Sequence, residues 1–227
     1  MTKKVTVKYF SDVLCVWAYV AQVRLDELKK KWQNQIEVEH HFVTLFANTK
    51  MRIGEGWQEK GGFDGFNKHV LEVLEEFPHC EINPQIWTQC RPSTSANAHI
   101  FLKAIDIYIK RNPEVDPANE IFELACWRVR KAFFQDALDI SDMSILFGIA
   151  DELQIDSKAL NDIINHGEAV AEVLLDQQLT DKYKIEGSPS YLFNNGRQKL
   201  YGNVGFKIID ANIQEVLSDN TEHASWC

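Results

Sequence analysis

One cysteine, Cys15, stands where the sequence changes from a strand pattern to a helix pattern. An apolar run over residues 5–10 precedes it, and a helix-like stretch begins near Val16. A thiol at a helix N-terminus faces unpaired backbone N–H groups and the positive end of the helix dipole. Such a position stabilises thiolate over thiol and can lower a cysteine pKa from ~8.5 to roughly 3.5–7.5. The sequence therefore predicts a nucleophilic Cys15 thiolate.

Cys15 has no second cysteine close to it in the chain. In a Cys-x-x-Cys arrangement the partner thiol would stand at position 18, on the same first turn, and would attack a mixed disulfide formed at Cys15. That position is Ala18. The other cysteines are Cys80, Cys90, Cys126 and Cys227. We expect the first three to be packing residues, whereas Cys227, at the end of a polar tail, is the candidate for a resolving thiol that folds back.

Composition and charge exclude several classes of partner. The 227-residue chain has a formal net charge of -9 and no dense Lys/Arg block with interleaved aromatic residues, which argues against nucleic acid and anionic membranes. No run approaches the ~18 apolar residues of a membrane span, and no secretory leader pattern is present. The cysteines have no spacing suited to zinc, and His40 and His41 should point to opposite sheet faces. We therefore expect a cytoplasmic protein without a metal or a tightly bound cofactor.

The pattern of elements places Cys15 directly after the first strand. Residues 4–9 and 36–45 are predicted to be strands, with one helix over residues 16–32 between them. A single connecting helix makes these strands parallel, with a right-handed crossover. Residues 48–65 are glycine-rich and polar, and helical periodicity dominates the chain from there to residue 167.

Helices are expected in this block over residues 66–76, 95–111, 117–134, 141–153 and 157–166. The last part of the chain predicts a helix over 169–183, strands over 190–193 and 198–201, and a closing helix over 206–217. Asn195-Gly196 lies between the two strands, and this pair supplies the positive φ angles that a type I′ hairpin turn needs. Without the helical block, the order of elements is β-α-β-α-β-β-α.

That order is the order of the thioredoxin fold, and four short motifs accompany it. They are Asp12-x-x-Cys15-x-Trp17-x-Tyr19, Ala98-His99, Phe133-Phe134-x(4)-Asp139-Ile140-Ser141 and Gly187-Ser188-Pro189-Ser190. With these motifs the chain resembles the DsbA-type thiol oxidoreductases, in particular the FrnE-like branch, which is related to 2-hydroxychromene-2-carboxylate isomerases and kappa-class glutathione transferases. The resemblance implies an α/β protein with a large all-helical insertion after the second strand. Residues 1–47 and 168–227 would form the thioredoxin-fold domain, and residues 48–167 the insertion.

The resemblance also implies which residues surround the thiol. A proline in the position of Pro189 follows a cis peptide bond and lies beside the active-site cysteine. Proline cannot donate an N–H, which leaves the Ser188 backbone free to pair with a bound peptide or with the cysteinyl part of glutathione. Trp17, next to the thiol, and His99, from the helical block, are the other candidates for contact with substrate or glutathione. Asp12 is expected to be mainly structural.

Three functions are consistent with these residues. The first is a thiol-disulfide oxidoreductase with a monothiol Cys-Val-Trp-Ala site, in which Cys15 attacks a peptide disulfide or a glutathione mixed disulfide. Either glutathione, as co-substrate, or Cys227 would then resolve the product. The second is a glutathione-dependent transferase or isomerase that acts on a small apolar electrophile. The third is a non-catalytic peptide-binding module of the same fold. The direction of redox exchange and the oligomeric state stay open at this point.

Overall fold

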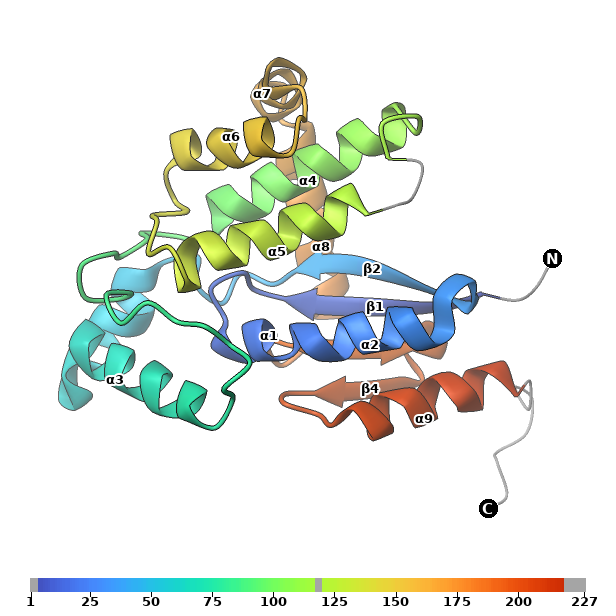
Figure 1. Cartoon of the computed structure of the whole chain (residues 1–227), viewed down its shortest axis with the longest axis horizontal. Coiled ribbons are helices and arrows are strands. Elements are labelled where there is room, and N and C mark those ends of the chain that lie inside the picture. The colour runs from blue at the N-terminus through green and yellow to red at the C-terminus, as the bar shows by residue number, and fades with distance from the viewer. Residues whose placement is uncertain (1–3, 117–119, 219–227) are drawn as a thin grey trace.

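Within residues 4–116 and 120–218, which the computed structural model describes, a four-stranded sheet lies between helices (Figure 1). The strands are β1 (Val5–Ser11), β2 (Ile36–Phe42), β3 (Ser190–Phe193) and β4 (Gln198–Tyr201), in the order β2-β1-β3-β4. β1 is parallel to β2 and antiparallel to β3, and β3 is antiparallel to β4. The C-terminal ends of β1, β2 and β4 therefore lie at one end of the sheet, and Cys15 follows β1 at that end.

Alternating residues of β1 supply the two sides of the sheet's core. Val7 and Tyr9 pack with residues of α2 (Gln22–Trp32) and α9 (Phe206–Leu217), which cover one face. Phe10 packs on the other face, beside α8 (Glu168–Tyr183). Figure 1 shows α2 and α9 in front of the sheet and α8 behind it. The period-2 pattern of the first strand thus creates two apolar faces, as a sheet covered on both sides requires.

The insertion after β2 is helical, as the sequence predicts. Its elements are a π-helical turn (Lys50–Glu55), a 3₁₀ turn (Gln58–Lys60), α3 (Gly62–Glu75), α4 (Ala96–Arg111), α5 (Ile121–Phe134), α6 (Met143–Glu152) and α7 (Ser157–Asn165). Two aspartates that precede helices accept backbone hydrogen bonds as N-caps, Asp142 for α6 and Asp156 for α7. Among the residues described, no helix combines the length and apolarity needed to cross a bilayer.

Several predicted element bounds differ from the structure; α3, for example, begins at Gly62 and not at residue 66. The helix predicted over residues 16–32 is divided at Ala21 into α1 (Val16–Val20) and α2. The strand predicted to end at residue 45 ends at Phe42, and residues 50–60 contain short helical turns where no element was predicted. β3, β4 and α9 have the predicted bounds. The hairpin turn is confirmed, since Asn195 and Gly196 have φ of 54° and 94° and Arg197 N–H donates to Asn194 O at 3.1 Å.

A buried ion pair between Asp176 and Lys103 lies beside the last residues of β2. Asp176 of α8 accepts hydrogen bonds from Phe42 N–H at 2.7 Å and from Lys103 Nζ at 2.8 Å, and it pairs with His41 Nδ1 at 2.7 Å. Lys103 of α4 also donates to the His40 carbonyl at 3.2 Å. Burial opposes ionisation of Asp176, but the contacts from His41 and Lys103 outweigh it and lower the pKa of this carboxyl. The pair therefore ties the insertion, α8 and the sheet together.

We predict that Asp176→Asn destabilises the protein by about 3–5 kcal/mol, because the Lys103 ammonium is then left buried without a counter-charge. The Lys103 side chain is 5% exposed, too little for water to take the place of the Asp176 carboxylate beside the ammonium. Urea unfolding followed by circular dichroism measures this change. Asp162→Asn, the same substitution at an exposed site on α7, is the control and should stay within about 0.5 kcal/mol of the parent. An equal, small effect of both substitutions would contradict the prediction.

Candidate active site around Cys15

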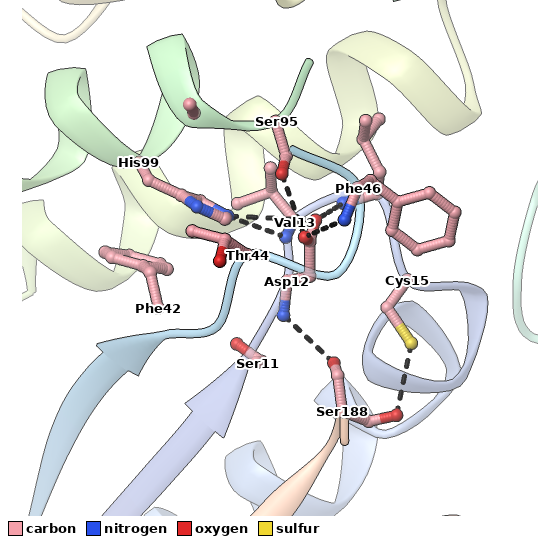
Figure 2. A network of polar contacts seen from close by, with 12 residues as sticks. Ser11, Asp12, Val13, Cys15, Phe42, Thr44, Phe46, Ser95, His99 and Ser188 are labelled. Atoms are coloured by element: carbon pink, nitrogen blue, oxygen red, sulfur yellow. Dashed lines mark hydrogen bonds and ion pairs between the residues drawn. The ribbon is translucent and has the colours of Figure 1, made fainter. Parts of the chain in front are cut away.

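Cys15 lies at the N-terminus of α1, next to the loop that enters β3. Its backbone is extended, with φ of -81° and ψ of 117°, and the helix starts at the following residue. The Cys15 thiol donates a hydrogen bond to the Ser188 carbonyl over 3.2 Å, as Figure 2 shows. The peptide bond between Ser188 and Pro189 is cis, the form that the resemblance implied. The fold thus brings Cys15, Ser188 and Pro189 together although more than 170 residues separate them in sequence.

Burial sets the acidity of this thiol. Cys15 is 6% exposed, and loss of hydration raises the pKa of its thiol above the ordinary value. The Ser188 side chain and the Ala18 N–H act in the opposite direction, while the Asp12 carboxylate raises the pKa further. The prediction of a thiolate with a lowered pKa is therefore wrong. A helix of five residues has few aligned peptide dipoles, and its N-terminus does not compensate for the loss of water around the sulfur.

The Asp12 carboxylate organises the turn that carries Cys15. It is fully buried, and its Oδ1 accepts a hydrogen bond from Leu14 N–H at 2.9 Å. Its Oδ2 accepts from Phe46 N–H at 2.9 Å and from Ser95 Oγ at 2.8 Å (Figure 2). The Asp12 N–H donates to Ser188 Oγ at 2.9 Å. One residue therefore connects the end of β1, the segment after β2, the start of α4 and the loop before β3, which agrees with the structural role expected for Asp12.

Arg130 of α5 lies against the same turn, and the sequence analysis did not identify it. Its guanidinium is buried and donates to Asp12 O at 3.0 Å and to Ser11 Oγ at 2.9 Å. A signal was present in the helix, because Arg130 follows Cys126 by four residues and precedes Phe134 by four. Both neighbours are buried, so Arg130 occupies a helix face that is otherwise apolar. An arginine on such a face needs acceptors, and the carbonyls beside Asp12 provide them.

His99 has a different position from the predicted one. It is fully buried, its ring stacks on Phe42 at 4.8 Å, and its Nε2 accepts the Val13 N–H at 3.3 Å (Figure 2). Burial lowers the pKa of His99, so the imidazole is neutral although Asp12 Oδ1 is 3.7 Å away. The prediction that His99 binds substrate or glutathione is therefore corrected. The side chain is enclosed between the sheet and the insertion, where it holds the turn before Cys15.

Trp17 and the remaining cysteines complete the predicted set. Trp17, the second residue of α1, is half-buried and packs edge-on against Phe77 at a ring distance of 6.1 Å. A contact between Trp17 and substrate stays a prediction.

Burial raises the pKa of Cys80 to about 11, of Cys90 to about 12, and of Cys126 well above its ordinary value. These three and Cys15 are free thiols, while Cys227 lies outside the described residues.

The two histidines that follow each other in β2 bind separate carboxylates. His40 Nε2 lies 2.8 Å from Glu123 of α5, whereas His41 contacts Asp176 of α8. In the part of the chain that the structure describes, no group of three or more His, Cys, Asp or Glu side chains is placed to hold a metal ion.

Solved structures share this architecture over nearly the whole chain. A probable DsbA oxidoreductase from Streptomyces coelicolor has a TM-score of 0.72 and 15% identity, covering 98% of this chain and 94% of its own. The cytosolic disulfide reductase DsbM from Pseudomonas aeruginosa, solved with GSH, has a TM-score of 0.62 and 16% identity. The match covers 86% of this chain and 89% of DsbM. A 2-hydroxychromene-2-carboxylate isomerase has a TM-score of 0.61 and 15% identity, covering 97% and 100%.

These similarities show the fold. The chain has the thioredoxin-like fold with a helical insertion that DsbA-like oxidoreductases share, as the sequence resemblance predicted. No protein-family model matches the sequence, and no curated protein matches it.

We predict that Cys15 reacts with iodoacetamide more slowly at pH 7 than an unstructured cysteine does. Because its pKa is raised above the ordinary value, the thiolate fraction is small at neutral pH and should still increase with pH at pH 9. Mass spectrometry of the alkylated peptide measures the rate at Cys15 alone. Ser188→Ala should slow the reaction at pH 8 by roughly three- to tenfold, since it removes a hydrogen bond that favours the thiolate.

Ser190→Ala is the matched control for this substitution. The Ser190 hydroxyl, at the first residue of β3, donates to the Gly187 carbonyl at 2.8 Å and is not among the groups that shift the pKa of Cys15, so its loss should leave the pH dependence at Cys15 unchanged. A rate that reaches its plateau below pH 7 in the parent protein would show an activated thiolate and contradict the prediction.

Proposed function

We propose that this protein is a cytoplasmic thiol-disulfide oxidoreductase that uses Cys15 as its single reacting thiol and glutathione as its co-substrate. The contact between Cys15 Sγ and the Ser188 carbonyl carries the proposal. It places the thiol against the bend that leads into β3, where the Ser188 N–H donates to no other described residue. The peptide part of a peptide–glutathione mixed disulfide can pair with such a segment in the manner of an added strand, which brings the disulfide to Cys15.

The exchange proceeds in two balanced steps. The deprotonated Cys15 sulfur attacks one sulfur of a mixed disulfide between substrate and glutathione. A bond from Cys15 to the glutathione sulfur forms, the original sulfur–sulfur bond breaks, and the substrate leaves as a thiolate that takes up a proton. Glutathione thiolate then attacks the sulfur of its bound counterpart, which releases Cys15 and yields oxidised glutathione. Ala18 supplies no thiol for this second step, so an external thiol is needed.

The raised pKa of Cys15 favours the reductive direction. Strong oxidants of this fold depend on a stabilised thiolate, because a thiolate of low pKa leaves a mixed disulfide readily. Cys15 lacks that stabilisation, since burial raises its pKa. It is therefore better suited to accept a sulfur partner from a disulfide than to donate a disulfide to another protein. DsbM, a disulfide reductase solved with GSH, is one structure of similar architecture and supports this direction.

The cytoplasm suits a site of this kind. The described cysteines are free thiols, and such thiols persist in a reducing compartment where glutathione is abundant. The second step consumes glutathione, and this compartment supplies it.

A glutathione-dependent isomerase or transferase is the second candidate. Cys15 stays protonated at neutral pH and donates a hydrogen bond, as a serine hydroxyl in its place would do. In that case the thiol would hold the sulfur of bound glutathione without forming a bond to it. The similarity to an isomerase over 97% of this chain favours including this reaction class.

Incubation with oxidised glutathione distinguishes the two functions. We predict one glutathionyl adduct, mapped by mass spectrometry to Cys15 and removed by added glutathione. Cys15→Ser should form no adduct there and should lose turnover of a peptide–glutathione mixed disulfide. Cys90→Ser is the control, because this thiol has a pKa of about 12 and should not contribute.

Two outcomes would reject the proposal. The first is a parent protein without an adduct on Cys15 even at pH 9. The second is a Cys15→Ser variant that still transfers glutathione to an electrophile, which would favour the isomerase or transferase. Cys227→Ser tests the resolving step separately, since unchanged turnover in this variant identifies glutathione as the resolving thiol.

A further inference from the structure

Tyr201, the last residue of β4, is an exposed aromatic residue held against the loop that carries Ser188. It is 54% exposed. Its backbone is opposite Ser190 in the β3–β4 pair, and the next N–H, of Gly202, donates to Pro189 O at 2.9 Å. Single exposed apolar side chains are ordinary on protein surfaces. The distinguishing feature of Tyr201 is the residue on which its ring rests.

That residue is Gly187, which makes room for the ring. A Cβ atom at position 187 would lie 2.8 Å from both Cε2 and Oη of Tyr201 and 3.1 Å from Cζ. Carbon atoms do not approach so closely, so any side chain at position 187 would displace the ring. Gly187 is not one of the glycines with positive φ, and its backbone conformation is therefore open to other residues. The ring contact, and not the backbone, is what needs a glycine here.

The Tyr201 ring lies against Gly187, the residue before the one that contacts the reacting thiol. Gly187 precedes Ser188, whose carbonyl accepts the Cys15 thiol at 3.2 Å. The Ser190 hydroxyl donates to the Gly187 carbonyl at 2.8 Å, on the far side of Pro189. β4 runs in the direction of β1, so Tyr201 lies at the end of the sheet where α1 starts (Figure 1). A polypeptide that paired with Ser188 and continued past Gly187 would meet the ring.

We propose that Tyr201 determines specificity for polypeptide substrates, by contact between its ring and an apolar side chain next to the substrate's reacting cysteine. This inference rests on the exchange reaction proposed above. Glutathione carries glycine and a γ-glutamyl group beside its cysteine and offers no such side chain. The contact therefore strengthens binding of polypeptide disulfides and leaves reaction with glutathione itself unchanged.

Three substrates test the contact: a peptide–glutathione mixed disulfide with phenylalanine beside the cysteine, the same peptide with serine there, and oxidised glutathione. Tyr201→Ala should raise KM for the phenylalanine peptide by roughly three- to tenfold with little change in kcat, the range for loss of one aromatic contact. The other two substrates should react as before. Tyr201→Phe keeps the ring and should behave like the parent. Leu174→Ala, at a residue of α8 that is 59% exposed, controls for loss of surface apolar area.

Gly187→Ala gives an independent measurement through the overlap described above. It should displace the ring and raise KM for the phenylalanine peptide as Tyr201→Ala does. Added to Tyr201→Ala, it should cause no further increase, because the overlapping atoms are gone. Equal effects of Tyr201→Ala on all three substrates, or none on any, would overturn the inference while the exchange reaction stands. If Cys15 reacts with none of them, the proposed function fails and this inference falls with it.

Discussion

The buried carboxylate of Asp12 is the constraint on which the rest of the site depends. A charge removed from water costs several kcal/mol unless hydrogen bonds replace its hydration. Leu14, Phe46 and Ser95 supply those bonds from three separate parts of the chain. Each donor must stay in place for the carboxylate to remain buried. These bonds therefore hold the turn after β1 against Phe46, which follows β2, and against Ser95, which precedes α4. Arg130 adds a second set of bonds, to the carbonyl of the same residue.

This arrangement reaches the thiol through Ser188. The Asp12 N–H donates to the Ser188 hydroxyl, and the Ser188 carbonyl accepts the Cys15 thiol. The turn is held rigidly, but the same burial removes water from the sulfur and brings a carboxylate near it, and both effects raise the pKa of Cys15. Rigid placement and thiolate activation therefore oppose each other at this site. Here placement prevails, which is the basis for the proposal that the site reduces disulfides and does not oxidise thiols.

The sequence predicts those parts of the structure that local chemistry determines. β3, β4 and α9 have their predicted bounds because the apolar run of β3, the Asn195-Gly196 turn and the helical periodicity of α9 are local signals. The meeting of Cys15 with Pro189 was predictable from motifs whose order defines the fold. The pKa of Cys15, the enclosure of His99 and the role of Arg130 were not predictable in this way, because each depends on how the insertion packs against the turn. Sequence spacing does not report such packing.

The insertion therefore helps to position the Cys15 site, because α1 packs against the insertion helices. Val16 and Tyr19 of α1 belong to the same apolar core as the insertion helices. Tyr19 stacks between Phe134 at 4.5 Å and Trp127 at 5.2 Å, both on α5. The helix that follows Cys15 thus packs against the insertion, while the loop that carries Ser188 belongs to the sheet. Because the thiol stands where these two parts meet, the distance between Cys15 and Ser188 depends on the packing of both.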